Sequence, residues 1–341
     1  MPDYSKRREK LQKLVRKGKC DALLVTNFTN VTYLTGFTGD DSYLLVGCDH
    51  VVLISDMRYE TQLGNECPGL DLIIRAPGQE MLPTAVDAVK ASKAKRMGVE
   101  ADSMTVGLRD KLAEKLTGVD LAPLDGLVEE LRVVKDKHEI DATRVACEQA
   151  RRAFEVVKAG LTPQMTELDI AAELEYQARR FGAKGLSFPP IIAVGPQAAL
   201  PHASPGKKRV EEADFTLFDW GANEGLYISD LTRMVVTGSV SARFEKLYNL
   251  VLKAQLAGIE AIKPGAKCKD VDAAARKVIE KAGYGKQFGH GLGHGTGLEV
   301  HEAPRLAKTW DLELKPGMIV TVEPGVYFPG WGGIRIEDDV L

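Results

Sequence analysis

The sequence predicts two domains of different classes: an α/β domain over residues 1–130 and an α+β domain over residues 131–341, whose antiparallel sheet is flanked by helices. Three observations predict this. Short apolar runs alternate with helical patterns up to about residue 130, a long helical pattern with a charged start follows, and later apolar runs are joined by turn sequences. The 341 residues, 44% of them hydrophobic and 27% charged, suffice for two ordinary globular domains.

The first domain shows alternating strand and helix patterns. Residues 5–17 have the apolar spacing of an amphipathic helix, and two later segments, 80–92 and 103–116, also look helical. Short runs rich in Leu, Ile and Val favour strands, because these side chains pack well on a pleated sheet. Such runs cover residues 21–26, 42–47, 50–55 and 71–76. We therefore expect a sheet flanked by helices.

The second domain is expected to begin with helices. A charged connector precedes a long helical pattern that Asp136 can cap and Gly160 can end, and we place the domain boundary at about residues 128–135. Thr166 is a candidate cap for a second helix, which stops near Gly182. Two further helical patterns cover residues 241–262 and 269–283.

Strand patterns lie between and after these helices. They are apolar runs bounded by turn residues, and they cover residues 190–195, 214–222, 226–238, 318–328 and 332–341. The turn sequences between consecutive runs favour antiparallel hairpins.

Composition excludes several classes of function. A net charge of −3 gives no general attraction to nucleic acid or to anionic lipid, so neither is an expected partner. No run of about 18 apolar residues is long enough to cross a bilayer, and no early apolar segment resembles a signal peptide. The five cysteines are scattered without a C-x-x-C pair, which is typical of reduced thiols. We expect a cytoplasmic protein with no membrane partner.

The hairpin expected over residues 214–238 carries two acids in strand positions where aspartate is uncommon. If its turn is centred between Glu224 and Gly225, Asp219 and Asp230 lie opposite each other on one face. Their β-carbons would then be about 5 Å apart. Two carboxylates this close should not both ionise without a cation. The alternative is a solvated aspartate beside the turn and a different register.

A second hairpin near the end of the chain repeats the pattern. Glu323 and Glu337 are symmetric about Gly330 in a wider, glycine-rich loop. With one nearby histidine, the two hairpins would supply four carboxylates and an imidazole. This set suits Mn²⁺, Co²⁺, Fe²⁺ or Zn²⁺, and four carboxylates are enough for two such ions. Paired ions can share a water and lower its pKa.

The histidine is sought in "GHGLGHGTGLEVHE", residues 289–302, which holds three of the six histidines, His290, His294 and His301. Glycines separate the first two, so a helical stripe of histidines is disfavoured. Because the hairpins already supply carboxylates, one of these histidines is sufficient as a ligand.

These segments resemble the metal-binding motifs of the pita-bread metallopeptidases, the group of methionine aminopeptidases, Xaa-Pro aminopeptidases, prolidases and metal-free creatinases. "DWGANEGLYISDLTR" resembles the two-aspartate hairpin, "GHGLGHGTGLEVHE" the histidine segment, and "TVEPGVYF" and "GIRIEDDV" the two glutamate strands. "NVTYLTGFTGDDSYLLV", "SDMRY" and "LRVVKDKHEIDATRVA" resemble the creatinase and prolidase N-terminal domain and its junction. The resemblance is strongest to Xaa-Pro dipeptidases (prolidases) and Xaa-Pro aminopeptidases. The family usually continues past the "IEDDV" strand, so we expect a chain trimmed at its C-terminus.

The resemblance implies a dinuclear metallopeptidase that hydrolyses the Xaa-Pro bond of dipeptides or short peptides. It assigns two divalent metal ions, with manganese expected first and cobalt, zinc or iron compatible. A hydroxide that bridges the metals would attack the peptide carbonyl, and Glu323 would act as general base and then acid. The implied metal ligands are Asp219, Asp230, His294, Glu323 and Glu337.

Other residues are assigned to catalysis or to the substrate by the same resemblance. His202, in "LPHASP", together with His290 and His301 would line the cleft, polarise the carbonyl and hold the tetrahedral intermediate. Arg335 shares a strand face with Glu337 and would orient a ligand carboxylate. Arg305 would grip the free carboxylate of a dipeptide, since a guanidinium binds carboxylates bidentately. The alternative for each is a structural or solvated side chain.

Two other classes of function stay open. One is a non-enzymatic, peptide-binding scaffold that retains the fold, and the other is a metal-free, creatinase-like amidinohydrolase. A complete ligand set disfavours both. A proline-containing dipeptide or short peptide is the expected substrate, and a homodimer is expected from the resemblance.

Overall fold

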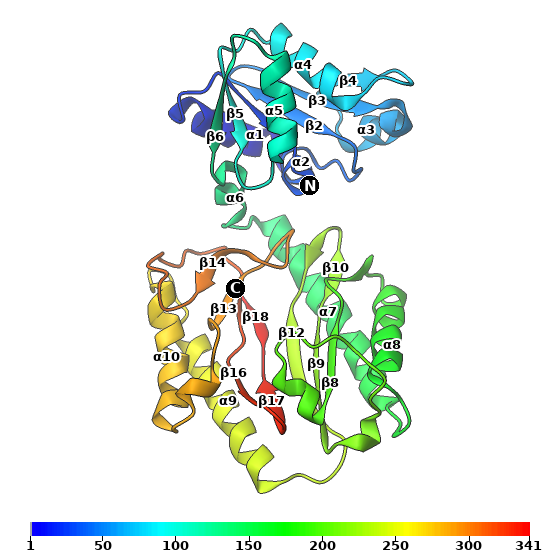
Figure 1. Ribbon diagram of the computed structural model, residues 1–341, viewed down its shortest axis with the longest axis vertical. Coiled ribbons are helices and arrows are strands. Elements are labelled where there is room, and N and C mark those ends of the chain that lie inside the picture. The colour runs from blue at the N-terminus through cyan, green and yellow to red at the C-terminus, as the bar shows by residue number, and fades with distance from the viewer. Residues whose placement is uncertain (1) are drawn as a thin grey trace. The chain divides into compact units, whose positions relative to one another are not determined.

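The computed structural model describes residues 2–341 and divides them into two compact units, one ending at Arg132 and the other running from Val133 to Leu341 (Figure 1). The first unit is α/β, and the second combines antiparallel strands with flanking helices. The predicted fold classes are thus confirmed. No helix within the described residues is long and apolar enough to cross a membrane.

The sheet of the first unit has the strand order β4-β3-β2-β1-β5-β6. β1 is antiparallel to β2 and parallel to β5, so the sheet is mixed. The four strands predicted from the sequence are found as β1 (Ala22–Val25), β2 (Tyr43–Gly47), β3 (Val51–Asp56) and β4 (Asp71–Arg75).

The remaining two strands, β5 (Arg96–Glu100) and β6 (Asp120–Leu124), do not stand out in the sequence. β5 begins with a charged residue and contains a glycine, and β6 contains Pro123, which is tolerated because β6 is an edge strand. The sheet core is formed by apolar side chains such as Leu24, Leu45 and Val89.

Helices surround this sheet. The three predicted ones are α1 (Tyr4–Lys17), α4 (Met81–Ala91) and α5 (Val106–Lys115). The sequence does not predict α2 (Phe28–Thr35), because its β-branched residues lower helix propensity. It forms with Asn27 as N-cap and Gly36, at φ 81°, as C-cap. Shorter helices complete the unit: η1 (Met57–Tyr59), α3 (Glu60–Glu66) and α6 (Leu127–Arg132).

The second unit begins with the expected pair of helices. Asp136 caps α7 (Lys137–Ala159) in a capping box with Glu139, and Gly160 is its C-cap. Thr166 caps α8 (Glu167–Arg180), and Gly182 follows its end with a φ of +100°. The two later helical patterns form α9 (Ala242–Ala261) and α10 (Cys268–Lys281). Short 3-10 helices lie at η2 (Gly195–Ala199), η3 (Val210–Glu212) and η4 (Gly285–Gln287).

The strands of the second unit form two groups between the helix pairs. α7 and α8 lie against the group that includes β8 to β12, and α9 and α10 lie against the group that includes β13 to β18 (Figure 1). The first group has the orders β12-β9-β8 and β11-β10-β7, and the second has β14-β13-β15-β18 and β16-β17.

The bounds of the first group are β7 (Gly185–Leu186), β8 (Ile191–Val194), β9 (Phe215–Trp220), β10 (Ala222–Glu224), β11 (Tyr227–Ile228) and β12 (Leu231–Val236). Those of the second are β13 (Gly293–Gly295), β14 (Glu302–Leu306), β15 (Val320–Val322), β16 (Gly325–Phe328), β17 (Gly332–Arg335) and β18 (Asp338–Val340). The sequence patterns do not predict β7, β10, β13 and β14, because these segments lack a clear alternation of apolar and polar residues.

Candidate metal centre

The first acidic hairpin forms, but its register differs from the expected one. Glu224 pairs with Tyr227, so Gly225 and Leu226 form the turn, and Asp219 lies opposite Thr232 rather than Asp230. The prediction that the two aspartates pair directly was therefore wrong by two residues. A shift of two residues preserves the face of every side chain, because side chains alternate along a strand. Both aspartates accordingly still reach one cavity.

The register expected for the second hairpin is confirmed on both sides of its acids. β16 pairs with β17 through Gly325 and Arg335, and β15 pairs with β18 through Val322 and Asp338. Glu323 and Glu337 lie between these two paired segments, at facing positions. The two hairpins meet at an isolated bridge between Thr232 and Glu337.

His294 lies on β13, and its imidazole is held in one orientation. Its ring Nδ1 donates to the carbonyl oxygen of Gly295 at 3.1 Å, because a carbonyl can only accept. In this tautomer Nε2 carries no proton and has a lone pair. It lies 3.4 Å from a carboxylate oxygen of Glu323 and 3.8 Å from one of Asp230. Burial lowers the pKa of His294 to about 4, so the ring is neutral at pH 7, as a metal ligand must be.

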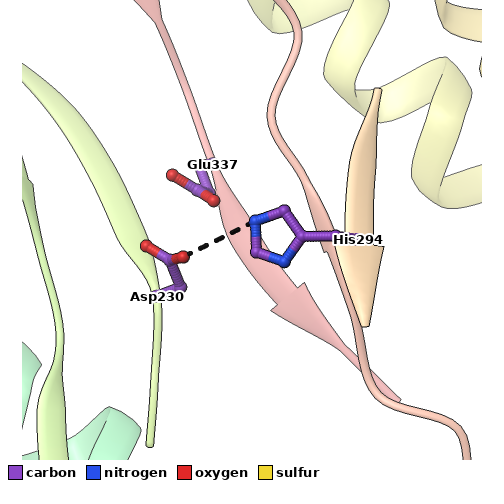
Figure 2. Close-up of side chains that lie close together, drawn as sticks. All are labelled: Asp230, His294 and Glu337. Atoms are coloured by element: carbon purple, nitrogen blue, oxygen red, sulfur yellow. Dashed lines mark ion pairs between the residues drawn. The ribbon is translucent and has the colours of Figure 1, made fainter. Parts of the chain in front are cut away.

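Asp230, His294 and Glu337 come together from three separate segments. Each offers one ligand atom, and these atoms lie within 4.8 Å of one another (Figure 2). All three residues are buried. They lie on the wall of a cavity of about 1050 Å³. The other residues singled out from the sequence line the same cavity: His202, Asp219, His290, His301, Arg305, Glu323 and Arg335.

The electrostatics of the acids favour the binding of a cation. Burial, reinforced by the neighbouring carboxylates, raises the pKa of both Asp230 and Glu337 well above their usual range. Burial also raises the pKa of Asp219, and that of Glu323 to about 8. Asp219 Oδ1 is buried and finds no hydrogen-bond partner among residues 2–341. A set of carboxylate oxygens with one neutral imidazole nitrogen suits divalent transition metals as ligands. The Oδ1 atom of Asp219 is one such oxygen.

Arg335 orients the first aspartate. Its guanidinium donates to Asp219 Oδ2 in a buried ion pair, and it also donates to the hydroxyls of Thr232 and Tyr327, each at 3.0 Å. Thr232 in turn donates to Glu337. The position of Arg335 on the strand face of Glu337 is what the hairpin register predicts.

Three residues of this network are not singled out by the sequence. Tyr327 and Thr232 share strand faces with the ligand acids, so the register offers a signal for both. Asp339 accepts the backbone N–H of Asp230 at 2.9 Å, and burial raises its pKa to about 7. The sequence carries no signal for Asp339, because this contact spans 109 residues.

His290 lies in the cavity wall with both ring nitrogens engaged. Nδ1 donates to the carbonyl oxygen of Gly291 at 2.7 Å, so Nε2 accepts from the Tyr327 hydroxyl at 3.0 Å. Burial lowers its pKa to about 4. His290 thus lines the cavity, and its contact with a substrate stays a prediction.

His202, His301 and Arg305 are exposed on the cavity wall. The His301 ring packs edge-on against the His294 ring with the centroids 4.3 Å apart. Arg305 lies on β14, opposite His294. Two histidines and a guanidinium thus face the space beside the acids, where a substrate carbonyl or carboxylate could be bound.

Comparison with known proteins agrees with this geometry. Residues 141–341 match metallopeptidase family M24, and residues 7–134 match the creatinase/prolidase N-terminal domain. A Xaa-Pro dipeptidase of Pyrococcus furiosus is 35% identical over 337 residues, covering 98% of this chain and 94% of that protein.

Two solved structures are similar over nearly their whole length. The Xaa-Pro dipeptidase from Bacillus anthracis matches with a TM-score of 0.96 and 36% identity, covering 99% of this chain and 95% of that one. The X-Pro aminopeptidase from Thermotoga maritima matches with a TM-score of 0.89 and 35% identity, covering 97% and 94%. The chain therefore belongs to metallopeptidase family M24 and carries the creatinase/prolidase N-terminal domain in front of its pita-bread domain.

Proposed function

We propose that this protein hydrolyses the Xaa-Pro bond of dipeptides or short peptides with two divalent metal ions. The observation that carries the proposal is the convergence of four carboxylates and the free Nε2 of His294 in one cavity, with Asp219 Oδ1 buried and without a hydrogen-bond partner among the described residues. The similarity to the Xaa-Pro dipeptidases of Pyrococcus furiosus and Bacillus anthracis and to the X-Pro aminopeptidase of Thermotoga maritima supports the substrate class.

The proposed metal ligands are Asp219, Asp230, His294, Glu323 and Glu337, and manganese is the proposed metal. Bound ions would lower the pKa of a water and polarise the scissile carbonyl. Arg335 holds Asp219 and donates to Thr232, which donates to Glu337. These contacts fix the orientation of the carboxylates before any ion binds.

Glu323 is the proposed proton carrier. Its carboxylate lies 3.4 Å from His294 Nε2, at the cavity wall. A carboxylate in this position can take a proton from the attacking water and return it to the leaving nitrogen. His202 and His301 would donate to the carbonyl oxygen as it gains charge. His290 would act through Tyr327, because both of its ring nitrogens are engaged.

The proposed preference for proline follows from the chemistry of the Xaa-Pro bond. Proline has no amide N–H and a fixed ring, so a site for it needs an apolar wall rather than an acceptor for that hydrogen. The wall of the same cavity includes the apolar side chains of Phe188, Ile191 and Val300.

The decisive experiment compares metal-free with metal-loaded protein. Chelator-treated protein is assayed on a Xaa-Pro dipeptide and a Xaa-Pro-Xaa tripeptide, and again after addition of Mn²⁺ or Co²⁺. We expect hydrolysis of at least one peptide only with metal, and about two ions per chain by elemental analysis. Folded, metal-loaded protein that cleaves neither peptide would contradict the proposal. Stoichiometric metal separates this function from a peptide-binding scaffold and from a metal-free amidinohydrolase.

Arg305 is the residue expected to determine whether the protein prefers dipeptides or longer peptides. It is exposed at the cavity wall, where it can pair with the free carboxylate of a dipeptide. We expect Arg305→Met to raise KM for the dipeptide by roughly tenfold, the worth of one charge-assisted contact, and to leave the tripeptide unaffected. Arg305→Lys should recover part of the loss. Equal effects on both peptides would assign Arg305 another role.

A further inference from the structure

Helix α10 carries a buried ion pair beside residues 288–292, the glycine-rich loop that leads into β13. Asp272 is fully buried, and Arg276, one helical turn later, is 6% exposed. The guanidinium binds the carboxylate through two bonds: Arg276 Nε donates to Asp272 Oδ2 at 2.8 Å, and Nη2 donates to Oδ1 at 2.7 Å. A bidentate pair of this kind fixes the plane of the guanidinium. Arg276 therefore presents its remaining N–H groups in a fixed direction.

The ion pair holds the glycine-rich loop at three backbone atoms. Arg276 Nη1 donates to the carbonyl oxygen of Phe288 at 3.1 Å, and Nη2 donates to that of His290 at 2.6 Å. Asp272 Oδ1 accepts the backbone N–H of Leu292 at 3.1 Å. The guanidinium also lies over the Phe288 ring, 4.1 Å from its centroid. The backbone is thus held at His290 and again two residues later.

This support matters because the sequence of the loop restrains its backbone little. Glycine has more backbone freedom than any other residue, so a glycine-rich segment loses more entropy when it becomes ordered. Gly289 and Gly291 flank His290, and a β-carbon at Gly289 would meet nothing within 4 Å. The His290 ring follows the backbone, because its Nδ1 donates to the carbonyl oxygen of Gly291. The contacts that fix the loop therefore also fix the imidazole.

The His290 ring begins a series of contacts that ends at a proposed metal ligand. Its Nε2 accepts from the hydroxyl of Tyr327 at 3.0 Å. The same hydroxyl accepts from Arg335 at 3.0 Å, and Arg335 donates to Asp219. Because a hydroxyl has a single proton, donation to His290 leaves the lone pairs of the Tyr327 oxygen for the guanidinium. The position of His290 thus determines how Tyr327 supports Arg335.

We propose that Arg276 is a positioning residue for the reaction, which holds the loop so that His290 contacts the Tyr327 hydroxyl. This inference rests on the proposed peptidase function. Asp272 orients the guanidinium for this task. Among residues 2–341, neither member of the ion pair lines the cavity, so the pair acts on the site through the loop.

The first test uses the full-length, metal-loaded protein and a Xaa-Pro substrate. Arg276→Met keeps an unbranched side chain that can pack against Phe288, but it removes every hydrogen-bond donor. We expect kcat to fall roughly 10- to 100-fold with little change in KM, which is the usual cost of losing a residue that orients the groups of a metal site. Folded Arg276→Met whose kcat lies within about twofold of the parent value overturns the proposal.

Two further variants complete this comparison. Arg276→Lys retains the charge beside Asp272 but lacks the planar fork that reaches two carbonyl oxygens, so its kcat should lie between those of Arg276→Met and the parent. The matched control is Arg179→Met, at an exposed ion pair with the same spacing of four residues on α8, and it should behave as the parent protein.

A double-variant cycle separates positioning from a general loss of stability. Tyr327→Phe removes the hydroxyl that His290 contacts and changes the shape of the side chain little. If Arg276 acts through this contact, Arg276→Met should lower kcat by less than about threefold in the Tyr327→Phe protein. The same fold loss in both backgrounds overturns the proposal, because a residue that only stabilises the fold acts independently of the hydroxyl.

A structural readout keeps this inference independent of the proposed activity. Crystal structures of the parent and of Arg276→Met should differ in residues 288–291 and in the distance from His290 Nε2 to the Tyr327 hydroxyl, while α10 keeps its position. If Arg276→Met does not fold, the structure of Arg276→Lys decides. An unmoved His290 overturns the proposal even if peptide hydrolysis is absent, whereas a moved His290 in a protein without peptidase activity refutes the proposed function alone.

Discussion

At the scale of single residues, burial turns ordinary acids into a site that requires a cation. Asp219, Asp230 and Glu337 are each less than a tenth exposed, and burial raises the pKa of all three. Neighbouring carboxylates raise the pKa of Asp230 and Glu337 further. The same burial lowers the pKa of His294 to about 4, which keeps its imidazole neutral. In the absence of metal, protons must replace the missing positive charge.

This charge balance predicts how the stability of the metal-free protein changes with pH. Glu323 has a pKa of about 8 in the fold and 4.5 ordinarily, and Asp339 has about 7 against 3.8. Because these pKa values are raised in the folded state, protonation of the two carboxyl groups stabilises the fold. This stabilisation is fully present below the ordinary pKa and is lost as the pH rises through the folded-state pKa. We expect the free energy of unfolding in chelator to fall between pH 6 and 8, by up to ~1.4 kcal/mol per pH unit for each group.

Urea denaturation at pH 6, 7 and 8, with chelator and with saturating Mn²⁺, measures this effect. Metal supplies the positive charge in place of protons, so the loaded protein should show a smaller decrease. The same reasoning makes apparent metal affinity rise with pH over this range. A metal-free protein whose stability is constant or increases from pH 6 to 8 would refute the explanation.

At the scale of elements, strand register decides which side chains reach the cavity. The first hairpin has its partners shifted by two residues from the expected pairing, yet its aspartates face the cavity, because side-chain direction repeats every two residues. β13 approaches β15 so closely that a β-carbon at Gly293 would lie 2.0 Å from Thr321 O. This close approach brings His294 next to Glu323.

Gly293 and Gly289 provide a matched pair of substitutions in the same segment. Gly293→Ala must push β13 away from β15, and we expect it to cost roughly 1–3 kcal/mol of stability and to reduce metal binding. A β-carbon at Gly289 meets nothing within 4 Å, so Gly289→Ala should stay within about 0.5 kcal/mol of the parent. Urea denaturation and elemental analysis measure both quantities. Similar effects of the two substitutions would show that the strand approach does not determine the site.

At the scale of the whole molecule, every proposed ligand lies in the second unit. The residues come from β9, β13 and the segments that follow β11, β15 and β17, which are held between two pairs of helices (Figure 1). Metal binding should therefore stabilise this unit selectively. The homodimer and the cytoplasmic location stay predictions.

Hydrogen exchange with and without Mn²⁺ tests this selectivity. We expect greater protection on metal binding in residues 215–236, 293–306 and 320–340, because the ligands tie these segments together. Residues 22–124 of the first unit should exchange at an unchanged rate. Equal gains in protection in both units would mean that metal binding acts on the whole chain.

The sequence by itself determined the two fold classes, the helix caps and the faces of the acids. These properties depend on local physics: periodicity, capping chemistry and the alternation of side chains along a strand. Asp136, Thr166 and the pairing across Gly330 follow from such rules. The resemblance of residues 289–302 to the histidine segment of the family singled out His294 as a candidate metal ligand.

Tertiary structure alone decided the register of the first hairpin, the strands without clear alternation, and the partners of the site residues. Tyr327 engages His290, Asp339 holds the backbone of Asp230, and Lys135 pairs with Glu302. These partners are far apart in sequence and none of them repeats with a period. Such contacts arise from the packing of one segment against another, which no local pattern in the chain encodes.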